Sequence, residues 1–427
     1  MENLFEFVSI HLNDDSTRLI LDRKKYPEID MDLAVACIES RRKLKGKVQE
    51  WYNETRLIFP LKLSAEQCSS SATGRYKAEL AERIVRESTP EKDWKIADLT
   101  GGLGVDSWFF SKKASQVLYN EMQEPLYEAA RHNFKTLHAD NILLSCTEVT
   151  VDTLSAVLKN FKADIIYMDP ARRGEGGRKV FLIEECTPDV LTLKDEIFRK
   201  VRNILIKLSP MADITMVCER LGSTCREVHV VATGGECKEL LIWMDREYDG
   251  EPTIKAVELN QDSIESTFSF TQNDEKSCWQ VTPLNNITLL IDRDSISLQS
   301  NCRHDLFIFE PGKALMKAGP FSLIATRFDL NKLGKSTHYY ITDSPDKAAE
   351  LKKYGKVFCI KESMTLDKRS IKDMGKKYPK AEVTARNIPM DTDTLRKKLG
   401  ITSGDDAHIF GLKSDQEGNL LIAATRI

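Results

Sequence analysis

The stretch Asp98-Leu99-Thr100-Gly101-Gly102-Leu103-Gly104-Val105-Asp106 decides the fold that this sequence predicts. It ends an apolar run, Lys95 to Leu99, which we expect to be a strand, and it leads into Ser107-Trp108-Phe109-Phe110, which begins a helix. A glycine-rich turn between a strand and a helix presents backbone N–H groups, and glycine leaves room for a ligand to approach them. We therefore expect a ligand site at this turn.

Short apolar runs alternate with helical stretches on both sides of this turn, which is typical of a parallel sheet with crossover helices. The expected strands are Lys95 to Leu99, Gln116 to Asn120, Ile142 to Val149, Asp164 to Met168, Asn203 to Leu208, Glu227 to Ala232 and Lys238 to Met244. Only Thr233 to Cys237 separates the last two, so we expect an antiparallel hairpin there. A seven-stranded, doubly wound sheet ending in such a hairpin is the Rossmann-like α/β layout of class I methyltransferases.

The regions outside this sheet show other patterns. Residues 1–70 have apolar positions at helical spacing, as in Met31 to Ile38, which predicts a helical N-terminal domain. Ser64 followed by Gln67 resembles a capping box, and a helix is expected from Thr73 to Glu87. After Glu251 we expect a small α+β unit with strands and one helix, followed by another α+β unit. The strands are Ser263 to Phe270, Thr288 to Ile291 and Leu306 to Phe309, and the helix is Lys313 to Arg327.

Composition indicates an ordinary globular protein of two or three domains. The chain has 427 residues, of which 41% are hydrophobic and 30% charged. No run of eighteen apolar residues occurs and the first residues lack a basic segment, so we expect a cytoplasmic protein without a membrane partner. The 10 cysteines form no C-x-x-C pair, which disfavours a metal site and favours buried thiols in a reducing compartment.

Charge is distributed unevenly. The net charge is −3, but Leu351 to Gly400 holds 14 Lys and Arg against 6 Asp and Glu, a balance of +8 that leaves −11 for the other residues. Such a basic segment is either a solvated lysine-rich face or a surface for a phosphate backbone. Charge by itself leaves both interpretations open.

The glycine turn and the strands after it predict a nucleoside-type cofactor. The G-G-x-G spacing differs from the G-x-G-x-x-G of dinucleotide sites. Asp98 would contact the cofactor's ammonium or a bound water, Glu121 the ribose hydroxyls, and Asp152 the adenine amino group. We expect S-adenosylmethionine, with ligands Asp98, Thr100, Gly101, Gly102, Gly104, Asp106, Glu121, Asp152 and Asp169.

Asp169-Pro170-Ala171-Arg172 follows the fourth strand, where open α/β sheets place their ligands. Pro170 fixes the chain, so that Asp169 and a neighbouring carbonyl can hold an exocyclic amine. Aligning a neutral nitrogen lone pair with a sulfonium methyl group is mainly a matter of orientation. The expected catalytic residues are Asp169, Pro170 and Arg172, although Asp-Pro alone commonly just ends a strand.

Two neighbouring features refine this reaction site. The glycine-rich loop after it contains Arg173, Arg178 and Lys179, which either clamp a phosphate together with Arg172 or are simply solvated. The fifth strand ends in Lys207-Leu208-Ser209-Pro210, where some uracil-carbon methyltransferases have a nucleophilic cysteine. Its absence disfavours covalent carbon methylation and favours direct transfer to nitrogen.

Over nearly its whole length the chain resembles bacterial class I methyltransferases with a THUMP-like C-terminal domain. The resemblance rests on Leu63 to Ser70, Tyr76-Lys77-Ala78, Asp98 to Asp106, Asp169 to Arg173, Phe309-Glu310-Pro311, Met316 to Gly319 and Arg386 to Met390. It implies a helical domain at 1–70, a catalytic domain at 71–250, a ferredoxin-like domain at 251–350 and a THUMP-like domain at 351–427. THUMP domains are associated with RNA, so the resemblance implies an RNA partner.

The run Asp98 to Asp106 also resembles the D-x-T-x-G-L-G-x-D motif of a ribosomal RNA guanine-N2 methyltransferase. The chain departs from that enzyme after Asp169-Pro170, where alanine follows and no aromatic residue is available to stack on a base. The local match therefore does not identify a target base.

The leading functional hypothesis is methyl transfer from S-adenosylmethionine to a base nitrogen of rRNA or tRNA. One alternative is a small-molecule or protein methyltransferase, which predicts that the segment from Leu351 is dispensable for activity. Another is a non-catalytic RNA-binding protein on a methyltransferase scaffold, which predicts RNA binding without turnover. The oligomeric state stays open.

Overall fold

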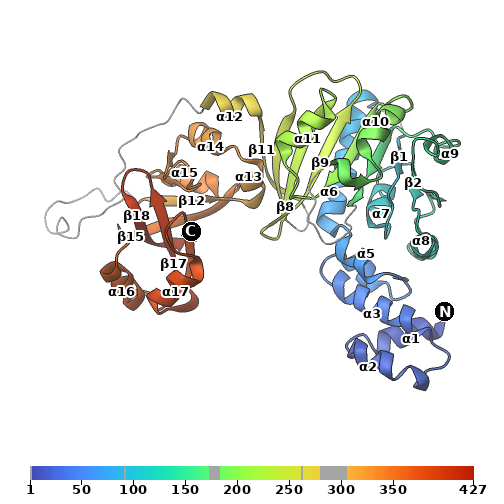
Figure 1. Ribbon diagram of the computed structural model, residues 1–427, viewed down its shortest axis with the longest axis horizontal. Helices are drawn as coiled ribbons and strands as arrows, with labels where there is room; N and C mark the ends of the chain where they lie inside the picture. The colour runs from blue at the N-terminus through green and yellow to red at the C-terminus, as the bar shows by residue number, and fades with distance from the viewer. Residues whose placement is uncertain (1, 91–92, 173–182, 261–262, 279–304) are drawn as a thin grey trace. The chain divides into compact units, whose positions relative to one another are not determined.

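The computed structural model describes residues 2–90, 93–172, 183–260, 263–278 and 305–427 (Figure 1). They form two compact units. The first comprises Met1–Thr253 with Leu259–Ile264, and the second comprises Ile254–Glu258 with Glu265–Ile427. No helix in the described residues is long and apolar enough to cross a membrane.

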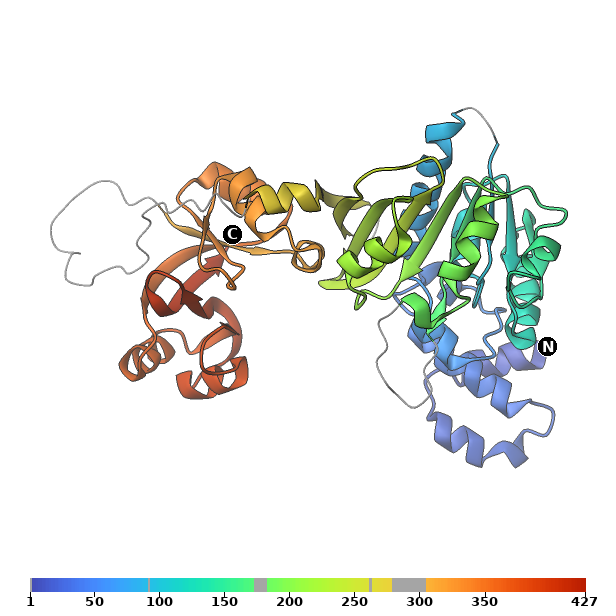
Figure 2. The same cartoon turned by 45° about the horizontal axis from the view of Figure 1, so that its top comes forward.

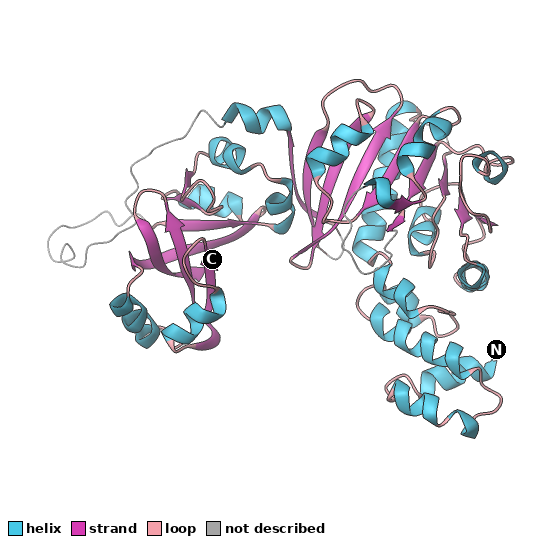
Figure 3. Cartoon of the chain, in the orientation of Figure 1, coloured by secondary structure: helices cyan, strands magenta, loops and turns pink. Residues whose placement is uncertain are grey.

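The N-terminal part of the first unit is helical, as predicted, and Figure 3 shows only helices and loops there. Its helices are α1 (Glu2–Ile10), α2 (Ser16–Leu21), the 3-10 helix η1 (Arg23–Lys25), α3 (Met31–Leu44), α4 (Gln49–Asn53) and α5 (Lys62–Gln67). The carboxylate of Asp30 caps α3 by accepting a hydrogen bond from Leu33 N. Buried Arg41 on α3 donates to the carbonyls of Tyr52, Glu54 and Thr55, and thereby ties the end of α4 and the residues after it to α3.

The expected capping box at Ser64 is wrong. Ser64 lies inside α5, whose N-cap is Leu61. The box is formed instead by Ser70 and Thr73 at the start of α6 (Ser71–Ser88), where each side chain accepts from the other residue's N–H, at 3.2 and 3.0 Å. These two hydroxyls satisfy each other's backbone donors, which Ser64 and Gln67 do not do.

The first unit contains all seven predicted strands. They are β1 (Lys95–Asp98), β2 (Gln116–Asn120), β3 (Ile142–Ser145), β4 (Ile165–Met168), β7 (Asn203–Leu208), β8 (Cys225–Thr233) and β9 (Glu236–Asp245). The sheet has the order β11-β10-β8-β9-β7-β4-β1-β2-β3. Two strands thus extend the predicted seven, β10 (Thr253–Leu259) and β11 (Ile264–Thr271), and in them the chain passes from one unit to the other. The strand expected over Ser263 to Phe270 is β11, but its expected place in the small α+β unit is wrong, because it pairs in the nine-stranded sheet.

The pairing directions explain where the functional residues gather. β1 runs parallel to β2 and β4, and β7 runs parallel to β4, whereas β9 is antiparallel to both β7 and β8, as predicted. The carboxyl ends of parallel strands meet at one edge of the sheet. Asp98, Glu121 and Asp169, which end or follow β1, β2 and β4, therefore lie at the same edge.

Helices cover both faces of this sheet. They are α6, α7 (Val105–Ser111), α8 (Glu124–Thr136), α9 (Leu154–Val157), α10 (Val190–Phe198) and α11 (Ile214–Leu221). In Figures 1 and 2, α10 and α11 lie on one face and α6 lies on the opposite face. This two-sided cover confirms the predicted Rossmann-like α/β fold.

The second unit is built on a seven-stranded sheet with the order β13-β14-β12-β15-β18-β17-β16. The strands are β12 (Phe307–Pro311), β13 (Asn331–Lys332), β14 (Tyr340–Thr342), β15 (Gly355–Thr365), β16 (Lys380–Arg386), β17 (Thr402–Ser414) and β18 (Gly418–Arg426). Alternating residues of β17 face two cores. Phe410 packs with Phe358 in one, and Ile409 packs with Leu395 of α17 in the other.

The helices of the second unit are α12 (Gln272–Cys278), α13 (Lys313–Ala318), α14 (Phe321–Phe328), α15 (Pro345–Leu351), α16 (Lys368–Lys377) and α17 (Thr392–Leu399). The single helix expected over Lys313 to Arg327 is wrong, because Gly319 adopts a left-handed conformation (φ +82°) and Pro320 follows it, so the helix ends and restarts. The strand expected at Thr288 to Ile291 lies outside the described residues.

Candidate active site

The glycine turn joins β1 to α7, and its glycines have different roles. A Cβ atom at Gly101 would lie 2.2 Å from the Tyr119 ring, and one at Gly104 would lie 2.6 Å from the Phe134 ring. At Gly102 (φ +53°) the nearest atom to an added Cβ is Thr100 O at 3.9 Å. Packing thus excludes side chains from two positions, whereas Gly102 borders open space on the side where its Cβ would project.

Asp98 ends β1 beneath this turn and is 1% exposed. Its oxygens accept hydrogen bonds from Thr100 N at 3.1 Å and from the Ser107 hydroxyl at 2.6 Å. Burial, reinforced by the nearby carboxylates of Asp106 and Asp169, raises the pKa of Asp98 to about 7. The acid makes no ion pair with a cationic side chain in the part of the chain that the structure describes.

Glu121 follows β2 and lies directly at the glycine turn. Its two carboxylate oxygens accept from Gly102 N and Gln123 N, each at 2.8 Å, and the residue is 6% exposed. A carboxylate oxygen accepts more than one hydrogen bond, so this arrangement fixes the group without exhausting its acceptors.

Asp152 lies apart from these groups. It is exposed in the turn before α9. Among the described residues, it forms neither a hydrogen bond nor an ion pair with another predicted site residue. Its contact with an adenine amino group stays a prediction.

Asp169 follows β4 and is linked directly to the glycine turn. Its backbone N–H donates to Thr100 Oγ1 at 2.6 Å, so the two predicted motifs share a hydrogen bond. Its Oδ2 accepts from Lys207 Nζ at 2.5 Å, and 38% of the side chain is exposed. Pro170 behind it is buried. The carboxylate is therefore held in place and yet accessible from solvent.

Arg172 lies in the short strand β5 (Ala171–Arg172), which pairs antiparallel with β6 (Cys186–Thr187). Its side chain lies outside the described part of the structure, as do Arg173, Arg178 and Lys179. The phosphate clamp expected from these residues stays a prediction.

Sequence reasoning missed Lys207 as a functional residue. It projects from β7, whose other residues are fully buried, and its side chain is 13% exposed. Burial alone would lower the pKa of this ammonium, but the carboxylates of Asp169, Glu239 and Asp106 outweigh burial and raise it. A single lysine within the apolar strand Asn203–Leu208 was the available signal.

A second buried lysine, Lys77 on α6, was quoted only for the resemblance. It is 0% exposed, lies 3.0 Å from Glu239 and 3.1 Å from Asp106, and donates to Ser69 Oγ at 2.5 Å. Asp106 also accepts from the hydroxyls of Ser69 and Tyr167, at 3.0 and 2.8 Å. The carboxylate of Asp106 is thus engaged inside the protein, and its expected contact with the cofactor stays a prediction.

The pKa shifts of the two buried carboxyl groups, Glu239 and Asp106, agree with these ion pairs. Burial raises the pKa of Glu239, with Lys77 and Lys207 opposing it. Burial would also raise the pKa of Asp106, but the charges of Lys77 and Lys207 hold that pKa below its usual range. Lys77 and Lys207 thus share the carboxylates of one cluster beneath the site.

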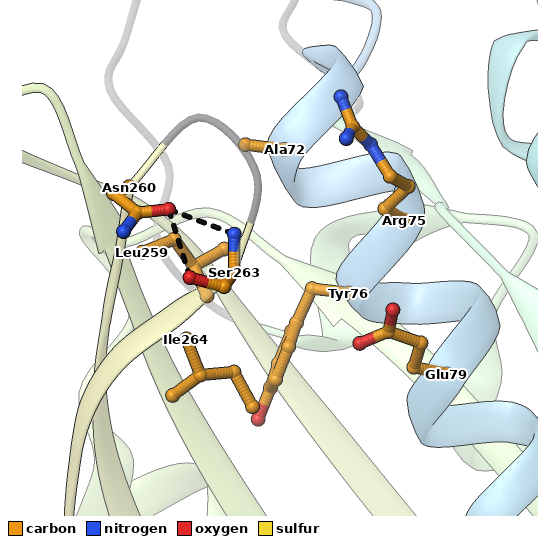
Figure 4. Close-up of a pocket in the computed structure, with 8 residues that line it drawn as sticks. All are labelled: Ala72, Arg75, Tyr76, Glu79, Leu259, Asn260, Ser263 and Ile264. Carbon is orange, nitrogen blue, oxygen red and sulfur yellow. Dashed lines mark hydrogen bonds between the residues drawn. The ribbon is translucent and has the colours of Figure 1, made fainter.

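A small separate pocket lies between α6 and residues at the end of β10 and the start of β11 (Figure 4). Tyr76 and Arg75 from α6 line it, together with Asn260, whose side-chain oxygen accepts from Ser263 N and Oγ at 2.7 and 3.2 Å. Buried Tyr76 shares a hydrogen bond with His229 Nδ1 at 2.6 Å. None of its lining residues belongs to the predicted cofactor or reaction site.

Comparison with protein-family models gives two matches, both in the second unit. A model described as a ferredoxin-like domain matches residues 307–348, and one described as THUMP domain-like matches residues 355–426. Comparison with curated proteins found no match.

Comparison with solved structures gives one similarity over nearly the whole chain. A Porphyromonas gingivalis W83 protein described as a candidate methyltransferase has a TM-score of 0.80 and 28% identity, and the similarity covers 99% of this chain and 97% of that one. Two others are similar over a smaller part. An rRNA methylase from Streptococcus thermophilus (TM-score 0.29, 12% identity) covers 39% of this chain and 93% of its own. M. capricolum TrmK with S-adenosyl-homocysteine (TM-score 0.29, 10% identity) covers 40% and 69%.

These findings bear on the expectations from sequence. The THUMP-like end matches a family model directly, and the P. gingivalis structure extends the resemblance across both units. The domain boundaries at 70, 250 and 350 stay predictions. The resemblance to class I methyltransferases with a THUMP-like C-terminal domain, and with it the Rossmann-like fold, is thus confirmed.

Proposed function

We propose that this protein transfers a methyl group from S-adenosylmethionine to a base nitrogen of RNA. The observation that carries the proposal is the hydrogen bond from Asp169 N to Thr100 Oγ1, which joins the glycine turn to the Asp-Pro segment. One site can therefore hold a donor at the turn and an acceptor at Asp169. The P. gingivalis relative supports the class of reaction.

The residues at the turn fit the cofactor. Buried Asp98 has a raised pKa and lacks a cationic partner among the described residues. The ammonium of the cofactor's amino-acid part would supply that cation and stabilise the ionised carboxylate. Glu121 has acceptor capacity left for ribose hydroxyls, and the open side of Gly102 leaves room for a ligand. When bound, S-adenosylmethionine supplies an electrophilic methyl group on a sulfonium.

The chain's own contribution to the reaction is positioning. The Asp169 carboxylate accepts a hydrogen bond from an N–H of the target amine and so turns the nitrogen lone pair away from itself. Lys207 holds one carboxylate oxygen, which leaves the other for the acceptor. As the amine gains positive charge, the carboxylate stabilises it and receives or passes on the released proton.

RNA is the acceptor class that the second unit supports. The positive balance of Leu351 to Gly400 falls on a region that includes α16 and α17, whose last turns carry Lys376, Lys377 and Arg396 to Lys398. Cations on adjacent helices provide the sequence-independent attraction for phosphates on which RNA binding depends. The THUMP domain-like match covers the same region.

The test is transfer of labelled methyl groups from S-adenosylmethionine to RNA, protein and small-molecule fractions of a bacterial extract, with calorimetric titration of S-adenosylmethionine and NADH in parallel. We expect label in RNA and binding of S-adenosylmethionine alone. Label in protein or metabolites would replace RNA with another acceptor. RNA binding without labelling, by the wild type and Asp98→Ala alike, would favour the non-catalytic scaffold.

A further inference from the structure

Three of the segments that carry the family resemblance have no role in the site above, and residues from all three line one pocket of the second unit. The pocket has an empty volume of about 380 Å³, which includes its open mouth. Glu310 comes from the end of β12, Lys313 and Met316 come from α13, and Arg386 and Asn387 come from the end of β16. Residues distant in sequence thus converge on one cavity.

The pocket wall is fixed by a strained residue. Asn387 has a left-handed backbone (φ +57°), and its side-chain amide donates to Ser336 O at 2.8 Å and to Thr337 Oγ1 at 3.1 Å. Asparagine tolerates this conformation better than most residues, but it still requires support from its surroundings. These hydrogen bonds hold the end of β16 against the segment before β14, so the pocket is preformed.

The pocket is electropositive. Its lining contains two cations, Lys313 and Arg386, and one carboxylate, Glu310, which accepts from the Tyr339 hydroxyl at 3.0 Å. Burial, followed by the charges of Lys332 and Arg386, lowers the pKa of His338 to about 4. This imidazole is therefore neutral at pH 7, and the charges of Lys332 and Arg386 add to the burial that suppresses its protonation.

The pocket also offers flat and polar surfaces. The His338 ring stacks on Phe321 with centroids 3.5 Å apart and an interplanar angle of 12°. Its Nδ1 is buried and has no hydrogen-bond partner among the residues that the structure describes. A buried polar atom costs free energy unless a water or a ligand satisfies it. The thioether of Met316 adds an apolar surface.

We propose that this pocket binds an unpaired nucleotide, with its phosphate held by Arg386 and Lys313 and its base held between Met316, His338 and Glu310. Two cations suit a phosphate, whereas a carboxylate and an unsatisfied imidazole nitrogen suit the polar edge of a base. A site for a simple anion would need neither the carboxylate nor the apolar surface. The nucleotide is either free or part of a single strand, and this inference does not rest on the proposed methyl transfer, because the pocket lies wholly in the second unit.

The binding experiment uses the full-length protein and calorimetric titration with the four nucleoside 5′-monophosphates, the parent nucleosides, inorganic phosphate, and an eight-nucleotide single-stranded RNA. We expect at least one monophosphate or the RNA to bind about tenfold more tightly than the nucleosides or phosphate. Stronger binding of the RNA would assign the site to a polymer, and stronger binding of a monophosphate would assign it to a free nucleotide. Equal affinity for phosphate and every nucleotide would overturn the proposal.

A variant and its control locate the binding. Arg386→Gln should weaken nucleotide binding about tenfold, whereas Arg131→Gln on α8 of the first unit, whose side chain is 63% exposed, should leave the affinity unchanged. Because Arg386→Gln can also disturb the pocket wall, a second measurement uses the wild-type protein. NMR follows the pKa of the His338 imidazole with and without nucleotide. A phosphate beside the cations should raise the pKa of His338 by about one unit or more. An unshifted His338 together with unchanged Arg386→Gln affinity would remove the nucleotide from this pocket.

Discussion

Lys77 and Lys207 share the same cluster of carboxylates, yet their surroundings differ. Lys77 is 0% exposed and meets only groups of the protein, namely Ser69, Asp106 and Glu239. Lys207 contacts Asp169, a carboxylate that is 38% exposed. The carboxylate partners of the first lysine are 3% and 11% exposed, whereas the second lysine holds a group that solvent and substrates reach.

Because of this difference, we expect the Lys77 end of the charged cluster to stabilise the fold and the Lys207 end to take part in the reaction. A fully enclosed ion pair contributes mainly through the large penalty for breaking it. A half-exposed carboxylate is fixed at one oxygen and free at the other, as a group that orients an acceptor must be. Substitutions at the two ends of the cluster should therefore change different measurements.

The largest effect is expected at Asp169. Asp169→Ala removes the group that orients the acceptor, so kcat for methyl transfer should fall about 10²- to 10⁴-fold, with little change in the calorimetric affinity for S-adenosylmethionine. Asp169→Asn keeps an acceptor oxygen and should retain more activity than the alanine variant. Turnover at the wild-type rate in both variants would remove Asp169 from the reaction.

Next in size is the loss of stability at Lys77. Lys77→Met leaves Asp106 and Glu239 buried with one cation fewer, and the free energy of unfolding should fall by about 3–5 kcal/mol in urea denaturation. Lys113→Met is a matched control, because the side chain of Lys113 is 42% exposed and its ion pair with Glu82 should contribute less than about 1 kcal/mol. Equal losses in both variants would show that burial of the ion pair does not matter.

Sequence alone predicted the parts of the fold that depend on periodicity and turn chemistry. Glycine spacing located the turn at Gly101 to Gly104, and the short link at Thr233 to Cys237 predicted the β8–β9 hairpin. The helix break at Gly319 was missed because helical periodicity continues across it. Ser64 was misread because Leu61 to Ser71 offers several hydroxyls, and the capping box forms between Ser70 and Thr73 instead.

The sequence predicted which residues gather at the site but not which side chains form ion pairs with one another. Asp98, Glu121 and Asp169 each end or follow a strand, so their common edge was foreseeable. The partners of a charged side chain depend on pairs such as Lys77 with Glu239, 162 residues apart, which no local pattern encodes. For the same reason no local pattern showed that Asp106, a predicted cofactor ligand, forms an ion pair with Lys77.

A pH-dependent effect is expected at Asp98, and the upward shift of its pKa determines the direction of that effect. The folded protein holds this proton up to about pH 7, whereas an unfolded aspartic acid releases it near 3.8, so the contribution of Asp98 to stability should decline as pH rises through that interval. A cationic ligand favours the ionised carboxylate. The affinity for S-adenosylmethionine should therefore rise by up to about tenfold per pH unit between pH 5.5 and 7 and level off above it.

Two comparisons make the Asp98 prediction specific. Asp98→Asn cannot ionise, so it should lose the pH dependence of S-adenosylmethionine binding and should not show the decline in unfolding free energy. Adenosine lacks the amino-acid ammonium, and its affinity should stay constant over the same pH range. If adenosine and S-adenosylmethionine follow the same pH curve, then Asp98 does not face the ammonium.

The smallest effect, and the sharpest test of the comparison, is expected at Lys207. Because Asp169 is partly exposed, Lys207→Gln should cost far less stability than Lys77→Met, while kcat should fall about tenfold with the KM for S-adenosylmethionine unchanged. Lys207→Arg keeps the charge beside Asp169 and should restore most of the lost kcat, which a purely structural role would not require. If Lys207→Gln instead unfolds the protein as readily as Lys77→Met, the two lysines serve one structural purpose, and the distinction between an enclosed and an accessible end of the cluster is wrong.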